Sequence, residues 1–294
     1  MRENARKIIL YAVWAALCLV VSLYVLFPGQ KARSFVEARF ARSAQGLTLN
    51  MAQASLVWPL SLRLEEPRFY SADGSRIFAL DFLEISASPF DLWAGRPDMT
   101  LSGKAYGGRI RAVLASQGEE GAGPVSVTVN LENLDASGIQ ILNRVTEREI
   151  TGTLTGRLEI KGPLSRLLSG QGKGDFSLTD GGFSLEGMFA DNTGMDVERL
   201  DVEMVLEGGA IQLSRIELAG NLASANATGT INPAVPLAHS KLDIRGMIRP
   251  SQALFQKLGS DSPLALAIRG NRQSSAQIRF RVTGTLGDRR LELL

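Results

Sequence analysis

Residues 150–186 read ITGTLTGRLEIKGPLSRLLSGQGKGDFSLTDGGFSLE and hold eight glycines among 37 residues, while apolar and polar positions still alternate. The alternation predicts β-strands that bury one face. The segment GQGKGD (170–175) resembles a phosphate-binding loop, but its spacing does not fit. A dinucleotide fingerprint requires glycine where this chain has Asp175, and a P-loop requires Ser or Thr in place of Gly174. We therefore interpret the glycines as turns and bends of an antiparallel sheet.

The same period-two alternation runs from Gly46 to the end of the chain. Strands are expected around seven apolar sets: Leu47/Leu49/Met51, Leu60/Leu62/Leu64, Phe78/Leu80/Phe82, Val125/Val127/Val129/Leu131, Leu154/Leu158/Ile160, Leu200/Val202/Met204/Leu206 and Ile278/Phe280/Val282. Glycine turns separate them at short intervals: Asp73-Gly74, Gly107-Gly108, Asp180-Gly181-Gly182, Gly208-Gly209 and Gly287-Asp288. Short connections join antiparallel neighbours, so the sequence predicts a long meander. Helix is expected only in short pieces, at Ser137–Thr146 and Ser251–Leu258.

The N-terminus carries a 20-residue apolar run, Ile8–Phe27, which only Ser22 interrupts. That length matches the hydrocarbon core of a bilayer, and no small-residue cleavage site precedes Pro28, so we expect an uncleaved transmembrane anchor. Residues 1–7 form a short cationic head that we expect to stay in the cytoplasm, with the bulk of the chain on the other side. Cys18 is expected to face lipid as an apolar residue.

The segment after the anchor, residues 28–45, places Phe35, Val36, Arg39 and Phe40 at helical spacing. This pattern predicts a juxtamembrane amphipathic helix whose basic residues face either lipid headgroups or solvent. Beyond it we distinguish an N-terminal β lobe (46–115), a hydrophilic loop (116–124) and a glycine-rich β region (125–294). The predicted fold class is mainly β: a single N-terminal transmembrane helix followed by an elongated, curled antiparallel β-sheet domain with a few short helices.

The order of these elements resembles the type II secretion system protein N family (general secretion pathway protein N, GspN). The likeness lies in the anchor ending in Phe27-Pro28, the following helix, and the segments GLTLNMAQASLVWPLSLRLEEPRF and LDFLEISASPFDLWAGRPDMTLSGKAYGGRI. The later patterns ITGTLTGRLEIKG and FRVTGTLGD are similar to the AsmA-like group of envelope proteins. That resemblance implies a curled sheet outside the bacterial inner membrane, and it carries over no catalytic residues.

The sequence contains few of the residues that commonly act in catalysis. His239 is the only histidine and Cys18 the only cysteine, so a zinc site, a Cys–His pair or a serine triad is not expected. Three carboxylate pairs, Glu65-Glu66, Asp81 with Glu84 and Glu119-Glu120, are more simply solvated charges than a glycosidase site. Trp58 and Trp93 are expected to be buried at sheet ends. Asn226-Ala227-Thr228 matches a glycosylation sequon, which is a weak pattern. We assign no catalytic, cofactor-binding or metal-binding residue.

The charge balance excludes one further class. The chain has 32 basic and 30 acidic residues and 6% aromatic residues, so nucleic acid is not an expected partner. The leading hypothesis, which rests on the resemblance, is a non-catalytic accessory component of the type II secretion system, with the inner membrane and other envelope components as partners. The alternative is an AsmA-like protein that binds or transfers lipid in an apolar β groove. The alternation of apolar and polar residues does not distinguish these two functions, because a closed protein core requires the same alternation as a lipid-binding groove.

Overall fold

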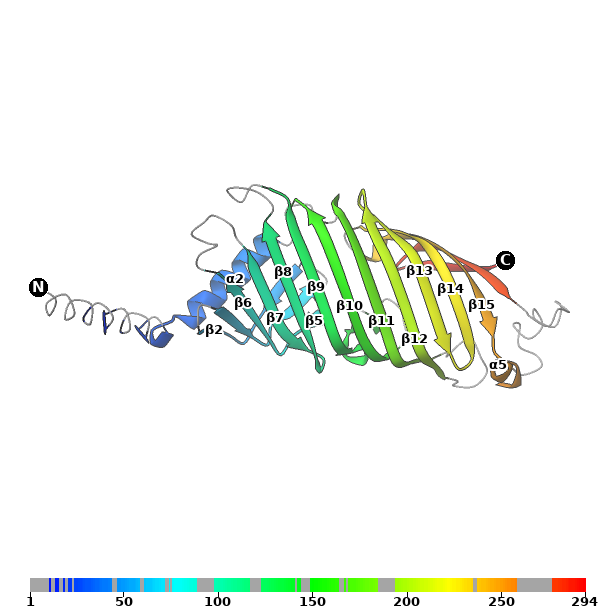
Figure 1. Ribbon diagram of the computed structural model, residues 1–294, viewed down its shortest axis with the longest axis horizontal. Helices are drawn as coiled ribbons and strands as arrows, with labels where there is room; N and C mark the ends of the chain where they lie inside the picture. The colour runs from blue at the N-terminus through cyan, green and yellow to red at the C-terminus, as the bar shows by residue number, and fades with distance from the viewer. Residues whose placement is uncertain are drawn as a thin grey trace, which may run out of the picture.

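In the computed structural model, one antiparallel sheet dominates the chain (Figure 1). The structure describes residues 11, 14–15, 18, 21–22, 24–43, 47–58, 61–71, 74, 76–88, 98–116, 123–140, 142–143, 149–163, 167, 169–184, 194–234, 237–257 and 277–294. The sheet has 14 strands in the order β17-β16-β15-β14-β13-β12-β11-β10-β9-β8-β7-β6-β3-β2. From β6 onward each strand pairs with its neighbours in sequence, which confirms the predicted meander.

The strands of this sheet are β2 (Gln53–Val57), β3 (Ser61–Glu65), β6 (Phe82–Ala87), β7 (Met99–Ala105), β8 (Gly108–Ser116), β9 (Val125–Asp135), β10 (Ile150–Gly162), β11 (Gln171–Ser184), β12 (Gly194–Glu207), β13 (Ala210–Gly220), β14 (Ala223–Asn232), β15 (Lys241–Pro250), β16 (Ile278–Thr285) and β17 (Arg289–Leu293). A separate three-stranded sheet contains β1 (Leu47–Asn50), β4 (Arg68–Ser71) and β5 (Arg76–Ala79). The helical elements are α2 (Gly29–Ser43), η2 (Ala136–Gly138), η4 (Leu237–His239) and α5 (Gln252–Lys257).

The large sheet has one apolar and one polar face, because successive side chains of a strand point to opposite sides. In β14, ASANATGTIN, the odd-numbered residues from Ala223 to Ile231 are apolar or glycine, and the even-numbered ones from Ser224 to Asn232 are polar and exposed. The register continues this arrangement from strand to strand: Ala225 pairs with Leu218 of β13 and with Ile248 of β15. The apolar residues therefore form one continuous face.

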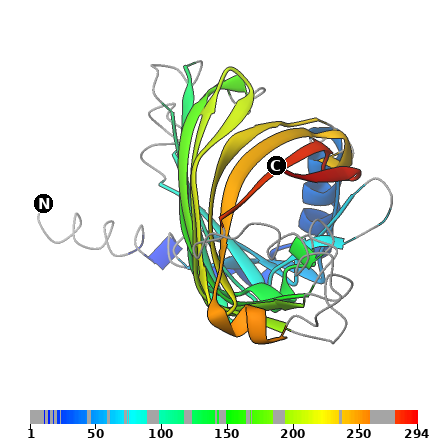
Figure 2. The same ribbon diagram turned by 90° about the vertical axis from the view of Figure 1, so that its right-hand side faces the viewer.

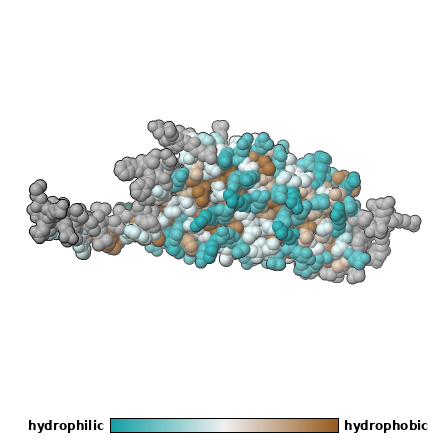
Figure 3. Space-filling view, in the orientation of Figure 1, coloured by the Kyte–Doolittle hydropathy of each residue, from teal (hydrophilic) through white to brown (hydrophobic). Residues whose placement is uncertain are grey.

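The sheet curls toward its apolar face. Seen end-on, the strands follow an arc, and β15 to β17 arch over its interior (Figure 2). The outward surface in Figure 3 is mainly hydrophilic, with scattered apolar residues. At Gly152, with φ +122°, the β10–β11 register shifts by a residue, so at least this glycine is the site of a bulge that the sequence predicted.

The apolar face is covered most fully at its N-terminal end. Ala32, Val36 and Phe40 of α2 pack against a buried cluster formed by Leu49, Met51, Ala54 and Leu64. A second cluster, Leu80, Ala105, Leu134 and Ile139, packs with Phe69 and Phe78 of the small sheet. At the C-terminal end, Leu254 of α5 packs against Met195, Leu222 and Ala223 near the strand ends. Between these covered regions, Leu200, Val202, Ile216 and Phe280 are only half-buried.

One expected strand is wrong. Phe78, Leu80 and Phe82 do not share a strand: Phe78 lies in β5 of the small sheet, and Phe82 begins β6 of the large one. The chain changes sheets at Leu80 and Asp81, whose N–H groups donate to the carbonyls of Pro67 and Lys104. In β6 the apolar face carries Leu83 and Ile85 instead, and Phe82 lies on the outer face beneath the Arg63 guanidinium.

The helical expectations are met where the structure describes them. The juxtamembrane helix is α2, and Ser251–Leu258 contains α5. In Ser137–Thr146 the described residues Gln140, Leu142 and Asn143 are helical after η2. β8 and β9 pair directly, so the hydrophilic loop 116–124 connects neighbouring strands of one sheet.

Much of the expected anchor, Ile8–Phe27, lies outside the described residues, although those described between Tyr11 and Val25 are helical. Within the described part of the chain, none of the helices is both long and apolar enough to cross a membrane.

Candidate functional site

The half-buried part of the apolar face borders a partly open cavity of about 320 Å³, which we call the inner cavity. Its lining is Ile150, Phe183, Leu200, Ile216, Leu218, Ala225, Asn226, Ala227 and Phe280. Asn226 is the single polar residue of this set. The volume falls within the range of small-molecule sites, which are mostly apolar and hold few polar groups.

The curl of the sheet creates this cavity. Ile150 lies in β10 and Phe280 in β16, so six strand-to-strand spacings separate them in the sheet order. In a flat sheet that separation would be about 29 Å at ~4.8 Å per spacing. Both residues nevertheless line one cavity, which requires the sheet to bend toward its apolar face between them.

Glycines let aromatic rings pack closely on neighbouring strands of the sheet. A Cβ on Gly246 of β15 would lie 2.7 Å from Cζ of Phe280 and from Cβ of Ala227, and it would also meet the carbonyl oxygen of Asn226. Gly156 of β10 stands in the same relation to the Phe176 ring. The missing side chains let aromatic rings lie close to the backbone of the neighbouring strand.

The apolar character continues to the last strand. Val282 of β16 pairs with Leu291 of β17, and Phe280 pairs with Leu293, so both leucines belong to the apolar face. Leu291 is 51% exposed and Leu293 is 52% exposed. β17 is the edge strand of the sheet, and Arg290 and Glu292 are exposed there as well, so the exposure of the two leucines follows from their edge position.

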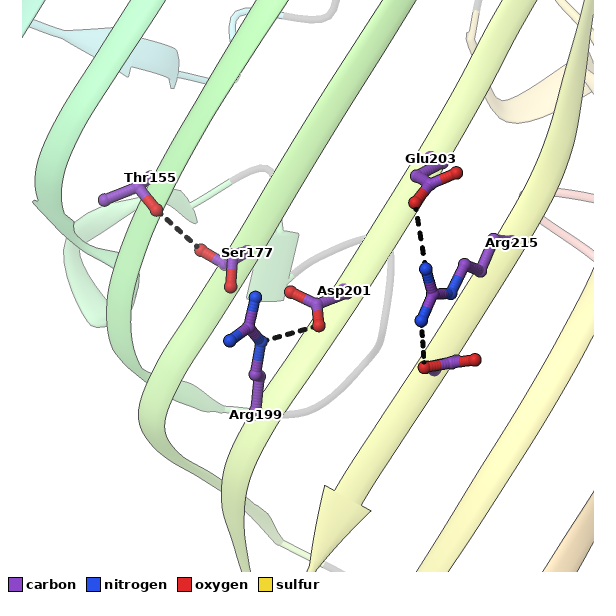
Figure 4. Close-up of polar contacts among 7 residues, drawn as sticks. Thr155, Ser177, Arg199, Asp201, Glu203 and Arg215 are labelled. Carbon is purple, nitrogen blue, oxygen red and sulfur yellow. Dashed lines mark hydrogen bonds and ion pairs between the residues drawn. The ribbon is translucent and has the colours of Figure 1, made fainter.

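The outer face carries ion pairs in place of apolar contacts (Figure 4). The guanidinium of Arg199 lies 2.6 Å from the Asp201 carboxylate two residues later. Arg215 lies between Glu203, at 3.2 Å, and Glu217, at 2.6 Å. Two more strands repeat the arrangement, with Arg157 beside Glu159 and with Arg245 beside Asp243. Alternation places residues i and i+2 on one face, so opposite charges at that spacing meet.

These pairs shift the pKa values of their members in the expected directions. The hydrogen bond from Arg199 is the main cause that lowers the pKa of the Asp201 carboxyl. Hydrogen bonding from Arg281 likewise lowers the pKa of Asp243, and that from Arg157 lowers the pKa of Glu159. All three carboxylates are stabilised in their charged form. None of these shifts moves a carboxyl toward neutral pH, where a general acid would operate.

The carboxylates that the sequence offered as candidate catalytic pairs mostly form ion pairs with arginine. Glu65 and Glu84 both contact Arg63, at 2.7 and 3.2 Å, and Glu66 contacts Arg68 at 2.8 Å. Asp81 is in the connection between the two sheets. Glu119 and Glu120 lie outside the described residues. Glu65 and Glu84 share the Arg63 guanidinium, which neutralises both, so the structure shows them as members of an ion-pair network on the outer face.

Among the remaining candidates that the structure describes, Asn226 borders the inner cavity and the others lie apart from it. His239 is exposed in η4, and Lys173 of the GQGKGD segment contacts Glu159 at 3.6 Å on the outer face. Asn226 is on the outer side of β14, although it also borders the inner cavity. Trp93 lies outside the described residues. Among the described residues, no cluster of three or more His, Cys, Asp or Glu side chains is placed to hold a metal ion.

The expected burial of Trp58 is wrong. The ring follows the end of β2 and is 74% exposed. Burial was expected because large rings at sheet ends commonly pack inward, but the cluster that α2 covers lies at the other end of this hairpin, where Ala54 pairs with Leu64.

The sequence missed the inner cavity for a physical reason. Its lining residues belong to six strands, β10 to β14 and β16, so no local motif contains them. Small residues at inward positions, such as Ala225, Ala227 and Gly246, are the available signal. Small residues at the inward positions of an alternating strand indicate that few side-chain atoms fill the space over that part of the inner face.

Comparison with known proteins identifies no relative: no family model, no curated protein and no solved structure matches the chain.

Proposed function

We propose that this chain is a non-catalytic protein of the bacterial inner membrane, anchored by residues 8–27, whose curled sheet on the periplasmic side holds the acyl chain of a lipid in the inner cavity. The observation that carries this proposal is the apolar cavity on the concave face, bordered by half-buried Leu200, Ile216 and Phe280. The similarity of the glycine-rich strands to the AsmA-like pattern supports the same reading.

Hydration of the half-exposed apolar side chains favours an apolar ligand. Apolar side chains that remain partly exposed on a concave wall leave unfavourable contacts with water, and an acyl chain removes them at roughly 25 cal/mol per Å² of buried apolar area. An alkyl chain needs no hydrogen-bond partners, and eight of the nine lining residues offer only apolar side chains. A polar metabolite would lose its hydration there without compensation.

The test compares two variants of the full chain. Ala225→Phe adds a benzyl group inside the inner cavity, and Thr230→Phe adds the same group to the outward side of the same strand. Native mass spectrometry after extraction from the membrane counts the bound lipids. Lipids around the anchor are common to both proteins, so the difference reports the cavity.

We expect Ala225→Phe to lose at least one bound lipid relative to the wild type, and Thr230→Phe to keep it. Equal lipid counts in all three folded proteins would contradict the proposal. Urea unfolding of each variant shows whether a loss of lipid follows from unfolding instead.

A second candidate function is an accessory role in type II secretion, with the sheet making contacts to other envelope components. The order of anchor, helix and strands favours it through the resemblance to protein N of that system. The polar outer face, with the ion pairs of Arg199 and Arg215, is the surface such contacts would use. Crosslinking from that face to secretion components, with an unchanged lipid count for Ala225→Phe, would favour this role over lipid binding.

A further inference from the structure

Helix α2 has two different long faces. Ala32, Val36 and Phe40 pack inward on the apolar face of the sheet. The side that flanks this packed face carries Lys31, Phe35, Arg39 and Arg42, all exposed and spaced three or four residues apart, so they form one stripe. We call this stripe the basic face of α2.

The charged residues of the basic face are all positive. Glu37 is the sole acidic residue in the sequence of α2, and it is turned toward the sheet. There it accepts hydrogen bonds from Arg33 Nε, at 2.9 Å, and from the backbone N–H of Met51, at 3.2 Å. The three cations of the basic face therefore surround Phe35, whose ring is 69% exposed, without an anionic residue of the helix among them.

Large apolar side chains are exposed at the same end of the molecule. Trp58 is 74% exposed at the end of β2, and the Tyr24 hydroxyl reaches the carbonyl oxygen of the preceding Val57 at 3.5 Å. Val25 and Leu26, just before α2, are 77% and 75% exposed. Figure 1 shows β2 beside α2 at the end of the molecule nearest the N-terminus. Exposed aromatic rings next to basic residues are typical of the membrane–water interface.

We infer that the basic face of α2 and Trp58 together rest on the surface of an anionic bilayer. The inference relies on the membrane anchor of the proposed function, because the anchor delivers α2 to the bilayer. The cations complement anionic headgroups, and Phe35 and Trp58 enter the boundary between headgroups and acyl chains. A protein partner is the less favoured occupant because the exposed apolar residues continue directly into Leu26 and Val25.

This contact orients the whole molecule. The inner side of α2 covers the apolar face at β2 and β3, so the same helix fixes the N-terminal end of the sheet to the bilayer. The inner cavity, lined by strands from β10 to β16, then lies away from the membrane along the sheet order. A bound acyl chain would be held at a distance from the surface that α2 contacts.

The test uses the full chain in vesicles. Cys18 is the single cysteine, so Cys18→Ser with Phe35→Cys gives one site for a nitroxide label, and Cys18→Ser with Thr230→Cys gives a matched label on the outward side of β14. The vesicles contain phosphatidylethanolamine with phosphatidylglycerol. Power-saturation spectroscopy compares collisions with oxygen, which concentrates in lipid, and with a water-soluble nickel chelate.

We expect the label at 35 to collide more with oxygen and at least threefold less with nickel than the label at 230. Replacing Lys31, Arg39 and Arg42 together by Glu should return the label at 35 to the aqueous pattern. A label at 35 that matches the label at 230 in the parent protein would overturn the inference. Protection of position 35 from both reagents would show a protein partner there and would overturn it as well.

The two proposals fail separately. The triple charge reversal leaves the lining of the inner cavity unchanged, so the lipid count by native mass spectrometry should stay at the wild-type value. An aqueous label at 35 with the Ala225→Phe loss of lipid intact rejects only the surface contact. An interfacial label with equal lipid counts in all cavity variants rejects only the acyl-binding function.

Discussion

At the scale of single residues, glycine decides how the inner face is built. The spacing of GQGKGD excluded a phosphate loop. The interpretation of its glycines as turns is wrong, because Gly172 and Gly174 lie inside β11. The turn expected at Asp180-Gly181-Gly182 is wrong for the same reason, since β11 continues to Ser184. The sequence did not indicate which glycines have a neighbouring ring over them. That depends on register, and the Gly246–Phe280 pair joins residues that are 34 positions apart in sequence.

Gly246→Ala should destabilise the fold, because the new Cβ meets the Asn226 carbonyl and the Phe280 ring. We expect a cost of about 1–3 kcal/mol, the usual penalty for overpacking. Gly194→Ala in β12 is the matched control, since a Cβ there has no neighbour within 4 Å. Urea unfolding measures both. Equal midpoints for the two variants would show that Gly246 is not constrained by its neighbours.

Asp243→Asn tests the outer ion pairs through their pH dependence. Arg281 lowers the pKa of Asp243 below its ordinary value of 3.8 in the folded protein. A carboxyl with a lowered folded pKa stabilises the fold above its unfolded pKa, and this stabilisation disappears as pH falls through the folded pKa. The melting temperature of the wild type should therefore exceed that of the variant at neutral pH. This difference in melting temperature should shrink as the pH falls below 3.8. A gap that is constant with pH would show that Asp243 acts by packing alone.

At the scale of elements, the period-two pattern predicted most strands because one face of each is apolar throughout. The period-two pattern failed at Phe78–Phe82, where the alternation continues although the chain passes from the small sheet to the large one. Strand pairing at that point is decided by the backbone hydrogen bonds of Leu80 and Asp81, which leave no trace in the spacing of apolar residues. The short helices were found because Leu254 and Val36 recur with their apolar neighbours at helical spacing.

The two faces of α2 predict opposite effects at adjacent positions. Val36→Asp places a carboxylate against the cluster of Leu49, Met51 and Leu64, and we expect it to lower stability by about 2 kcal/mol. Phe35→Asp lies on the exposed face and should leave the free energy of unfolding nearly unchanged. Thermal unfolding of the full chain in detergent measures both variants. A larger loss for Phe35→Asp than for Val36→Asp would reverse our assignment of the helix faces.

At the scale of the whole molecule, alternation predicted the meander, and the glycines and the AsmA-like resemblance predicted its curl, but none of them could show how the apolar face is covered. A closed core and an open groove require the same apolar positions. The difference lies in tertiary packing: α2 and the small sheet cover the N-terminal strands, while Leu200, Ile216 and Phe280 stay half-buried.

The anchor is a prediction at this scale as well. Intact-mass analysis of the protein from membranes should show that residues 8–27 are retained, and alkaline carbonate should fail to extract it, because a 20-residue apolar run matches the hydrocarbon thickness. A mature chain that starts after Pro28 would remove the anchor from the account.

Site-specific photocrosslinking in the bacterial envelope tests the central claim, lipid binding in the inner cavity, most directly. Phe280→p-benzoylphenylalanine places the photoreactive group in the lining of the inner cavity, and Met247→p-benzoylphenylalanine places it on the outward side of β15. After irradiation, mass spectrometry of the peptide identifies the attached molecule. The account predicts lipid adducts at position 280 and none at position 247. Adducts at position 280 that are only intramolecular, or lipid attached equally at both positions, would contradict it.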